Sequence, residues 1–181
     1  MVTVNMKSIW PERPTKKSNK MATANRNLSA YDKDNVPTGA DFKIGIVVSE
    51  WNDEITSKLL KGAKVTLLEN GVKEGNISVY YVPGAFELPL GCQFMFDAHH
   101  VDGIVAIGSV IQGETKHFDF VCSGATEGIM NVMLKYNKPI SYCLLTDNNK
   151  QQAIDRSGGK HGNKGVECAI ALIKMVALKV S

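Results

Sequence analysis

The stretch that decides the fold is GIVAIGSVIQGETKHFDF, which runs from Gly103 to Phe120. Its first half, Gly103–Ile111, is a continuous run of apolar and small residues, which indicates a buried strand. A short turn with Gly113 and Thr115 follows, and a predicted helix begins at His117. Such a junction leaves free backbone N–H groups at the positive end of a helix dipole, where anions bind. Because histidine titrates near neutral pH, the stretch suggests proton transfer on a phosphorylated small molecule.

This junction is not specific by itself. Strand–glycine–helix turns are common in α/β proteins and most of them bind nothing, and a lone histidine at a helix start is usually a cap or a solvated residue. The sequence contains neither the P-loop pattern GxxxxGK[ST] nor the dinucleotide pattern GxGxxG. The rest of the chain therefore has to support the functional interpretation.

On both sides of this stretch, apolar strand-like runs alternate with segments of helical periodicity. The predicted strands are Lys43–Ser49, Ile77–Val82, Gly103–Ile111 and Pro139–Thr146. The predicted helices are Asn52–Asn70, Ala85–Ala98, His117–Tyr136, Asn149–Arg156 and Val166–Leu178. Helices between strands indicate parallel crossovers, and strands that are apolar along their whole length are covered on both faces. We therefore predict an α/β fold, a flavodoxin-like three-layer α/β/α sandwich with a four-stranded parallel sheet.

Polar and glycine-rich segments follow each predicted strand. They are Ser49–Asn52, Pro83–Glu87, Val110–His117 and Thr146–Asn148. Ligands of parallel sheets bind beyond the carboxyl ends of the strands, so these four segments should converge. Trp51 offers a flat stacking face and Asn52 an amide that donates and accepts. Gly84 opens a helix whose first turn carries Glu87; each of these residues has an ordinary structural explanation, but together they favour a site.

Composition limits the class of protein. Hydrophobic residues make up 44% of the 181 residues, which suits one domain with a core. Residues 1–20 carry a net charge of +4, so the remaining 161 residues carry −1, which argues against nucleic acid as a partner. No apolar run reaches the length of about 18 residues that a membrane span needs, and the basic start lacks the apolar core of a signal peptide. We expect a cytoplasmic protein that binds no membrane.

The cysteines are expected to be small buried hydrophobes in a reducing compartment. None of them forms a CxxC pair, so a zinc or redox motif is not indicated. They are Cys92, Cys122, Cys143 and Cys168.

Residues 1–40 are polar and show neither helix nor strand periodicity. We expect a flexible N-terminal extension, or one ordered only against another subunit, followed by a folded domain over residues 41–181. Met21 is a second plausible start, so residues 1–20 are hypothesised to lie upstream of the true start.

Four motifs in order carry a family resemblance. They are VVSEWN at 47–52, VPGAFELP at 82–89, GSVIQGETKHFDFVC at 108–122 and QQAIDRSGGKHGNKG at 151–165. With them the chain resembles the 6,7-dimethyl-8-ribityllumazine synthases from about Phe42 to Leu178. The resemblance implies condensation of 5-amino-6-(D-ribitylamino)uracil with 3,4-dihydroxy-2-butanone 4-phosphate, which releases phosphate and water in the penultimate step of riboflavin synthesis. It implies no metal and no organic cofactor.

The resemblance also implies a role for each motif residue. Proton transfer is implied for His117. Phosphate binding is implied for Gly113, Glu114, Thr115 and Arg156. Pyrimidine and ribityl binding are implied for Trp51, Asn52, Gly84, Ala85, Phe86, Glu87, Val110, Ile111, Tyr142 and Lys164.

Among these residues, Tyr142, Arg156 and Lys164 match positions that reach into the site from a neighbouring subunit. The resemblance thus implies a homo-oligomer: a pentamer, a pair of pentamers or an icosahedral shell of twelve pentamers. The short glycine-rich turn GGKHGNKG favours the shell. Riboflavin synthase, which uses the product, is a further candidate partner.

The chemistry suits these residue types. Imine formation, phosphate elimination and ring closure each move a proton, and one histidine can both give and take it. Arginine is suited to the departing phosphate dianion. The chain departs from the family pattern at Gln112, where many relatives carry arginine, at Tyr142, which replaces a common phenylalanine, and at His161, which replaces a common small residue. None of these changes removes a group that the mechanism needs.

Other classes of function remain open. One is a lumazine- or flavin-binding protein that has lost catalysis, although a pure binder needs no phosphate site. Another is a shell or scaffold protein with incidental activity. A flavodoxin-like electron carrier would bind phosphate after its first strand, where this chain reads SEWNDE, which is acidic and has no glycine.

Overall fold

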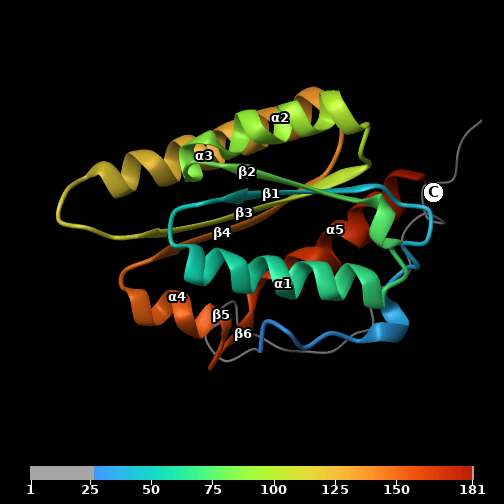
Figure 1. Cartoon of the computed structure of the whole chain (residues 1–181), viewed down its shortest axis with the longest axis horizontal. Coiled ribbons are helices and arrows are strands. Elements are labelled where there is room, and N and C mark those ends of the chain that lie inside the picture. Colours follow the sequence, from blue (N-terminus) through green and yellow to red (C-terminus); the bar gives the residue numbers. More distant parts are fainter. Residues whose placement is uncertain (1–26, 181) are drawn as a thin grey trace, which may run out of the picture.

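The computed structural model describes residues 27–180, which form a four-stranded parallel sheet between two layers of helices (Figure 1). The strands lie in the order β2-β1-β3-β4, and each neighbouring pair is parallel. Their bounds are β1 (Ile44–Ser49), β2 (Ile77–Val82), β3 (Gly103–Ile111) and β4 (Ile140–Asp147). This arrangement confirms the predicted three-layer α/β/α fold with its four-stranded parallel sheet.

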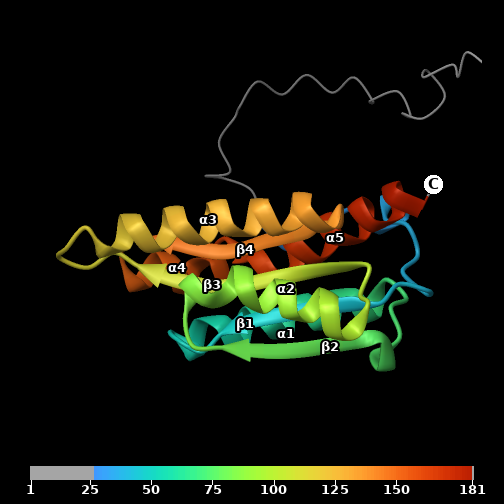
Figure 2. The same cartoon turned by 90° about the horizontal axis from the view of Figure 1, so that it is seen from above.

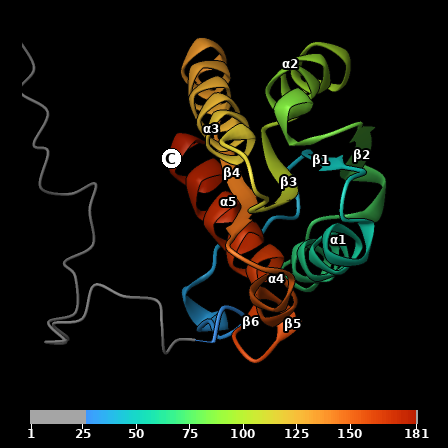
Figure 3. The same ribbon diagram turned by 90° about the vertical axis from the view of Figure 1, so that its left-hand side faces the viewer.

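The helices divide between the two faces of the sheet. One layer contains α2 (Leu88–His99) and α3 (His117–Tyr136), and the other contains α1 (Asp53–Glu69), α4 (Lys150–Arg156) and α5 (Lys164–Val180), as Figures 1 and 3 show. A hairpin of β5 (Ser157–Gly159) and β6 (Gly162–Asn163) joins α4 to α5. Residues 27–180 also contain three short 3-10 helices: η3 (Lys33–Asn35), η4 (Glu74–Asn76) and η5 (Ala85–Glu87).

The core has two halves because strand side chains alternate between the faces of the sheet. Ile46 of β1 packs with Leu59 and Ile173 in the layer of α1 and α5. Its neighbour Val47 packs with Leu88 in the layer of α2 and α3. Both faces are therefore covered, which explains why the strands read as unbroken apolar runs.

Side-chain hydrogen bonds explain where α4 and α5 begin. The Asn149 side chain accepts a hydrogen bond from Gln152 N at 3.1 Å and so caps α4. Asn163 Oδ1 accepts one from Gly165 N at 2.8 Å, which lets α5 begin at Lys164, two residues before the predicted start. The segment SGGKHGNKG forms a short antiparallel hairpin.

Three of the four cysteines are fully buried, as predicted: Cys92, Cys143 and Cys168. Cys122 is only half-buried, so for this residue the prediction was wrong. The reason is that α3 buries little of its surface, with only Ala125, Ile129 and Val132 in the core.

Part of the expected N-terminal extension contacts the domain. Leu28 N donates to His161 O at 2.7 Å, Asn163 N donates to Ser29 Oγ at 2.9 Å, and Gly39 N donates to Asn70 O at 2.8 Å. This segment runs beside the β5–β6 hairpin (Figure 3). Residues 1–26, with the hypothesised upstream start, lie outside the described residues, and the domain boundary at residue 40 stays a prediction. No helix within residues 27–180 is long and apolar enough to cross a membrane.

Candidate functional site

The carboxyl ends of β1, β2 and β3 meet at a cavity of about 630 Å³, the strand-end cavity. Nine of its lining residues were predicted: Trp51, Asn52, Gly84, Ala85, Phe86, Glu87, Val110, Ile111 and His117. Three were missed, namely Ser109, Phe120 and Val121. Phe120 lies three residues after His117 on α3, and that helical spacing is the signal that could have found it.

Aromatic side chains give this cavity its chemical character. Trp51 is 73% exposed, Phe86 60% and Phe120 71%, although all three are large and apolar. Exposed aromatic faces grouped around one cavity are suited to stacking on a planar ring. Within residues 27–180, neither lysine nor arginine lines the strand-end cavity.

Asn52 fixes the junction between β1 and α1. Its backbone has a φ of 59°, in the left-handed region that asparagine tolerates better than most residues. Its side-chain Nδ2 donates to Ser109 O at 2.9 Å and so ties the end of β1 to the end of β3. Asn52 therefore holds two lining segments of the strand-end cavity together, and its amide oxygen Oδ1 can still accept a hydrogen bond.

Gly84 lies where there is little room for a side chain. A Cβ there would be 3.0 Å from Glu87 Oε2 and 3.5 Å from Trp51 Cδ1. The backbone at Gly84 is therefore accessible between a carboxylate and an indole. A polyhydroxylated chain can bind there, because carboxylates and backbone groups exchange hydrogen bonds with hydroxyls.

Phe86 is positioned by close packing between α2 and α3. A Cβ on Gly124 would lie 2.7 Å from Phe86 Cε2, and a Cβ on Gly128 would lie 2.6 Å from Pro89 Cγ. The two glycines that interrupt α3 in the sequence thus allow its close approach to η5 and α2. Gly124 in particular leaves room for the Phe86 ring.

The turn between β3 and α3 projects beyond the sheet (Figure 2). Gly113, Glu114 and Thr115 are exposed there and do not line the strand-end cavity themselves, whereas Ile111 and His117 at either end of the turn do. Thr115 Oγ1 accepts a hydrogen bond from His117 N at 3.4 Å. The turn and the helix start thus place an exposed histidine beside free backbone donors, as the sequence indicated.

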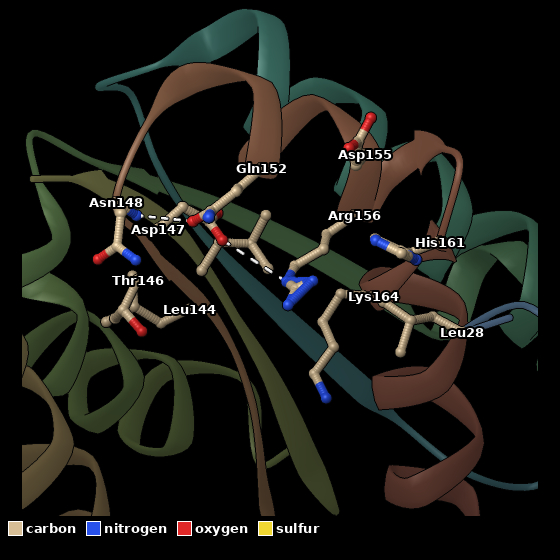
Figure 4. Close-up of a pocket in the computed structure, with 11 residues that line it drawn as sticks. Leu28, Leu144, Thr146, Asp147, Asn148, Gln152, Asp155, Arg156, His161 and Lys164 are labelled. Carbon is tan, nitrogen blue, oxygen red and sulfur yellow. Dashed lines mark hydrogen bonds and ion pairs between the residues drawn. The ribbon is translucent and has the colours of Figure 1, made fainter. Parts of the chain in front are cut away.

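The segment after the fourth strand lines a separate cavity, so the prediction that all four segments converge was wrong. Thr146, Asp147 and Asn148 line a second cavity of about 480 Å³, the charged cavity, together with Arg156 and Lys164 (Figure 4). The cause is the strand order. β4 is the edge strand on the far side of β3 from β1 and β2, and it leads to α4.

The charges of this cavity are paired within the chain. Arg156 Nε lies 3.6 Å from Asp147 Oδ1, and the other carboxylate oxygen of Asp147 is buried without a hydrogen-bond partner in the described part of the chain. Burial raises the pKa of Asp147, and the Arg156 charge opposes that rise. Lys164 Nζ lies 2.6 Å from Glu167 Oε1. Burial lowers the pKa of Lys164. The hydrogen bond to Glu167 and smaller charge interactions raise it, and the net pKa is raised.

Tyr142 lines neither of these two cavities. It packs on the α2 and α3 side of the sheet, and its hydroxyl lies 2.7 Å from Thr126 Oγ1. Burial raises the pKa of this phenol. Within one chain, therefore, Tyr142, Arg156 and Lys164 are not brought to His117. Their contribution from a neighbouring subunit stays a prediction, as does a reaction without metal or cofactor.

Comparisons with known proteins agree on one family. The family model described as 6,7-dimethyl-8-ribityllumazine synthase matches residues 41–180. A protein of that name from Christiangramia forsetii is 56% identical over 160 residues, which cover 88% of this chain and 95% of the relative. One from Flavobacterium johnsoniae is 54% identical over 88% of this chain and 84% of the relative. One from Porphyromonas gingivalis is 48% identical over 88% of this chain and 99% of the relative.

The family match covers every lining residue of the two cavities except Leu28. The identity to curated relatives extends over most of the length of both partners. The chain therefore belongs to the 6,7-dimethyl-8-ribityllumazine synthase family.

Proposed function

We propose that the chain condenses 5-amino-6-(D-ribitylamino)uracil with 3,4-dihydroxy-2-butanone 4-phosphate in a site that two subunits share. The observation that carries this proposal is the separation of the two cavities. The strand-end cavity has aromatic faces and His117, but no cationic Lys or Arg side chain lines it within residues 27–180. Arg156 and Lys164 line the charged cavity instead. A phosphorylated substrate needs both sets, so the charged cavity of one subunit has to meet the strand-end cavity of another.

The pyrimidine substrate fits the strand-end cavity. Trp51 stacks on the ring, with Phe86 beside it, and the backbone of Val110 and Ile111 presents donors and acceptors to the ring edge. The ribityl chain lies along the backbone of Gly84 and Ala85 and donates hydroxyls to the carboxylate of Glu87. Asn52 adds a polar contact through the amide oxygen that it does not use in the chain.

The phosphate of the second substrate binds where the two subunits meet. The turn Gly113–Thr115 offers backbone N–H groups and the Thr115 hydroxyl. Arg156 of the neighbour supplies two parallel donors, the geometry that suits a phosphate. Lys164 and Tyr142 of the neighbour contact the pyrimidine substrate.

Four chemical events follow. The amine of the pyrimidine condenses with the ketone to an imine, and water leaves. A proton is removed from carbon and the phosphate departs with its bonding electron pair. The second amine then closes the ring, and a further water leaves. His117 gives and takes these protons, and much of the acceleration comes from holding two substrates side by side.

Apolar side chains on the outer helices support an oligomer. Phe94 of α2 is 55% exposed and Leu134 of α3 is 70% exposed, and Leu90 and Met130 are more than half exposed as well. Exposed apolar groups on two adjacent helices are typical of a surface covered by another chain. We propose rings of five subunits that assemble further into a shell, located in the cytoplasm, with riboflavin synthase as the consumer of the product.

A coupling assay tests the proposed function. Purified protein is mixed with both substrates, and the fluorescent lumazine is followed against a blank without enzyme and against His117→Ala. We expect formation well above the blank, slowed in the variant by about 100-fold or less, because positioning survives the loss of the proton carrier.

Two outcomes would overturn the proposal. Tight binding of the pyrimidine without turnover would indicate a binding protein. A rate for His117→Ala equal to that of the blank would show that positioning contributes nothing and that the mechanism is wrong.

A further inference from the structure

One titratable side chain of the charged cavity, His161, has no polar partner within residues 27–180. Asp147 faces Arg156, Lys164 pairs with Glu167, and Asp155 Oδ1 accepts a hydrogen bond from Gln151 Nε2 at 2.9 Å. The ring of His161 also lines this cavity, yet within residues 27–180 it has neither a hydrogen bond nor an ion pair. It is the one titratable lining group with no polar partner in that part of the chain.

The backbone of His161 is held from two sides. Its N–H donates to Asp155 O at 2.8 Å, and its carbonyl accepts from Leu28 N at 2.7 Å. The next residue, Gly162, has a φ of +83°, and a Cβ there would lie 2.9 Å from Leu28 N. The hairpin and the N-terminal segment therefore fix this residue at the cavity wall. Both His161 and Arg156 line the cavity, and in the view of Figure 4 the Arg156 guanidinium is drawn between the His161 ring and Asp147.

The charges that face the cavity balance when this imidazole is neutral. Arg156 and Lys164 offset Asp147 and Asp155. Glu167 on α5 is bound to Lys164, Lys160 in the hairpin turn is exposed, and Asn27–Ser29 of the N-terminal segment carry no charge. Protonation of the ring would therefore add one positive charge to the cavity. Histidine is the residue type whose ordinary pKa lies nearest neutral pH.

We infer that His161 is a further phosphate-binding residue of the reaction, which donates a ring N–H to the phosphate monoester beside Arg156. The inference rests on the proposed function, in which this cavity meets the second substrate. A charge-assisted hydrogen bond from an imidazolium to a phosphate oxygen is stronger than a neutral one. The bound dianion also favours the protonated ring, so substrate and proton bind together.

Three variants test the inference. Each is compared with the wild type at the same pH, so that any pH dependence that the two proteins share cancels. In His161→Ala, KM for the butanone phosphate should rise about 3- to 10-fold at pH 6 and less than about 2-fold at pH 8.5. KM for the pyrimidine should not change. His161→Lys should restore the low KM at both pH values because its charge is permanent. His161→Gln keeps a donor without charge and should resemble alanine at pH 6.

The inference would be overturned if the ratio of KM in His161→Ala to KM in the wild type did not vary with pH. It would also be overturned if KM rose equally for both substrates. If His161→Ala fails to assemble, the comparison of His161→Gln with His161→Lys decides by the same criteria. Calorimetric titration with inorganic phosphate separates this inference from the proposed function. A wild type that makes no lumazine refutes the function, whereas phosphate affinity that is equal in wild type and His161→Gln at pH 6 refutes the role of His161.

Discussion

The strand-end cavity and the charged cavity differ in what they present. The first offers aromatic faces and backbone groups, whereas the second offers charges that already have partners in the same chain. A flat ring needs the former and a phosphate the latter. The difference teaches that, in the proposed function, one subunit presents the groups that bind the ring and another presents the cations that bind the phosphate.

The division arises at a single point in the fold. Gln112 N still donates to Asp147 O at 2.9 Å, so β3 and β4 remain paired up to the end of β4. Beyond that point β3 leads to α3 and β4 leads to α4 on the opposite face. The edge position of β4 separates the two cavities, and in the proposed function each cavity is one half-site of a shared active site.

Loss of the charged half-site should have the largest effect. Arg156→Ala removes the bidentate phosphate donor and leaves the buried carboxylate of Asp147 without its cation. We expect kcat/KM for the butanone phosphate to fall about 100-fold, as for the loss of one donor in a preorganised site. Steady-state kinetics with each substrate varied in turn measure this.

Arg156→Lys is the matched control. It keeps the charge but loses the planar, two-donor geometry of arginine. Its kcat/KM for the butanone phosphate should therefore lie between the values of wild type and Arg156→Ala. A fall of less than about threefold in Arg156→Ala would contradict the assignment of phosphate binding to this half-site.

A change to the aromatic half-site should be smaller and selective for the other substrate. Gly124→Ala puts a methyl group against the Phe86 ring, whereas Gly128→Ala puts one against Pro89, which lines neither cavity. Displacement of the ring should raise KM for the pyrimidine by about 3- to 10-fold in Gly124→Ala. Gly128→Ala overpacks the same pair of helices and should leave that KM unchanged. Equal effects of the two variants would show that Phe86 does not bind the ring.

The smallest expected effect is on stability. Because burial raises the pKa of Asp147, the folded protein holds this proton more tightly than the unfolded chain does. The contribution of Asp147 to the free energy of unfolding is therefore greatest in acid and is lost as pH rises through the raised pKa.

Asp147→Asn removes this titration. Its free energy of unfolding relative to wild type should increase as pH rises from about 3.5 to 7, by no more than about 1 kcal/mol. Urea unfolding at fixed protein concentration measures it. A relative stability that decreases with pH would mean that Arg156 outweighs burial.

The sequence predicted the strand-end cavity well and the charged cavity poorly. The apolar run of β3 and the turn before His117 are local signals, and the observed bounds of β3 and α3 match the prediction. Trp51, Gly84 and Glu87 follow strands whose ends have to meet at one sheet edge. The face taken by α4 depends on tertiary packing, and nothing local to Asp147 reveals it. The contact between Leu28 and His161 joins distant parts of the chain and has no local signal either.

Subunit mixing tests whether the two half-sites of different chains form one active site. One variant, His117→Ala with Trp51→Ala, lacks the strand-end half, and the other, Arg156→Ala, lacks the charged half. The two are co-expressed with different tags, and mixed assemblies are purified through both tags. Random arrangement in a ring pairs two intact halves at about a quarter of the interfaces. Recovery of about a quarter of the wild-type activity is the predicted result. Activity no higher than the mean of the two variants alone would contradict a shared site.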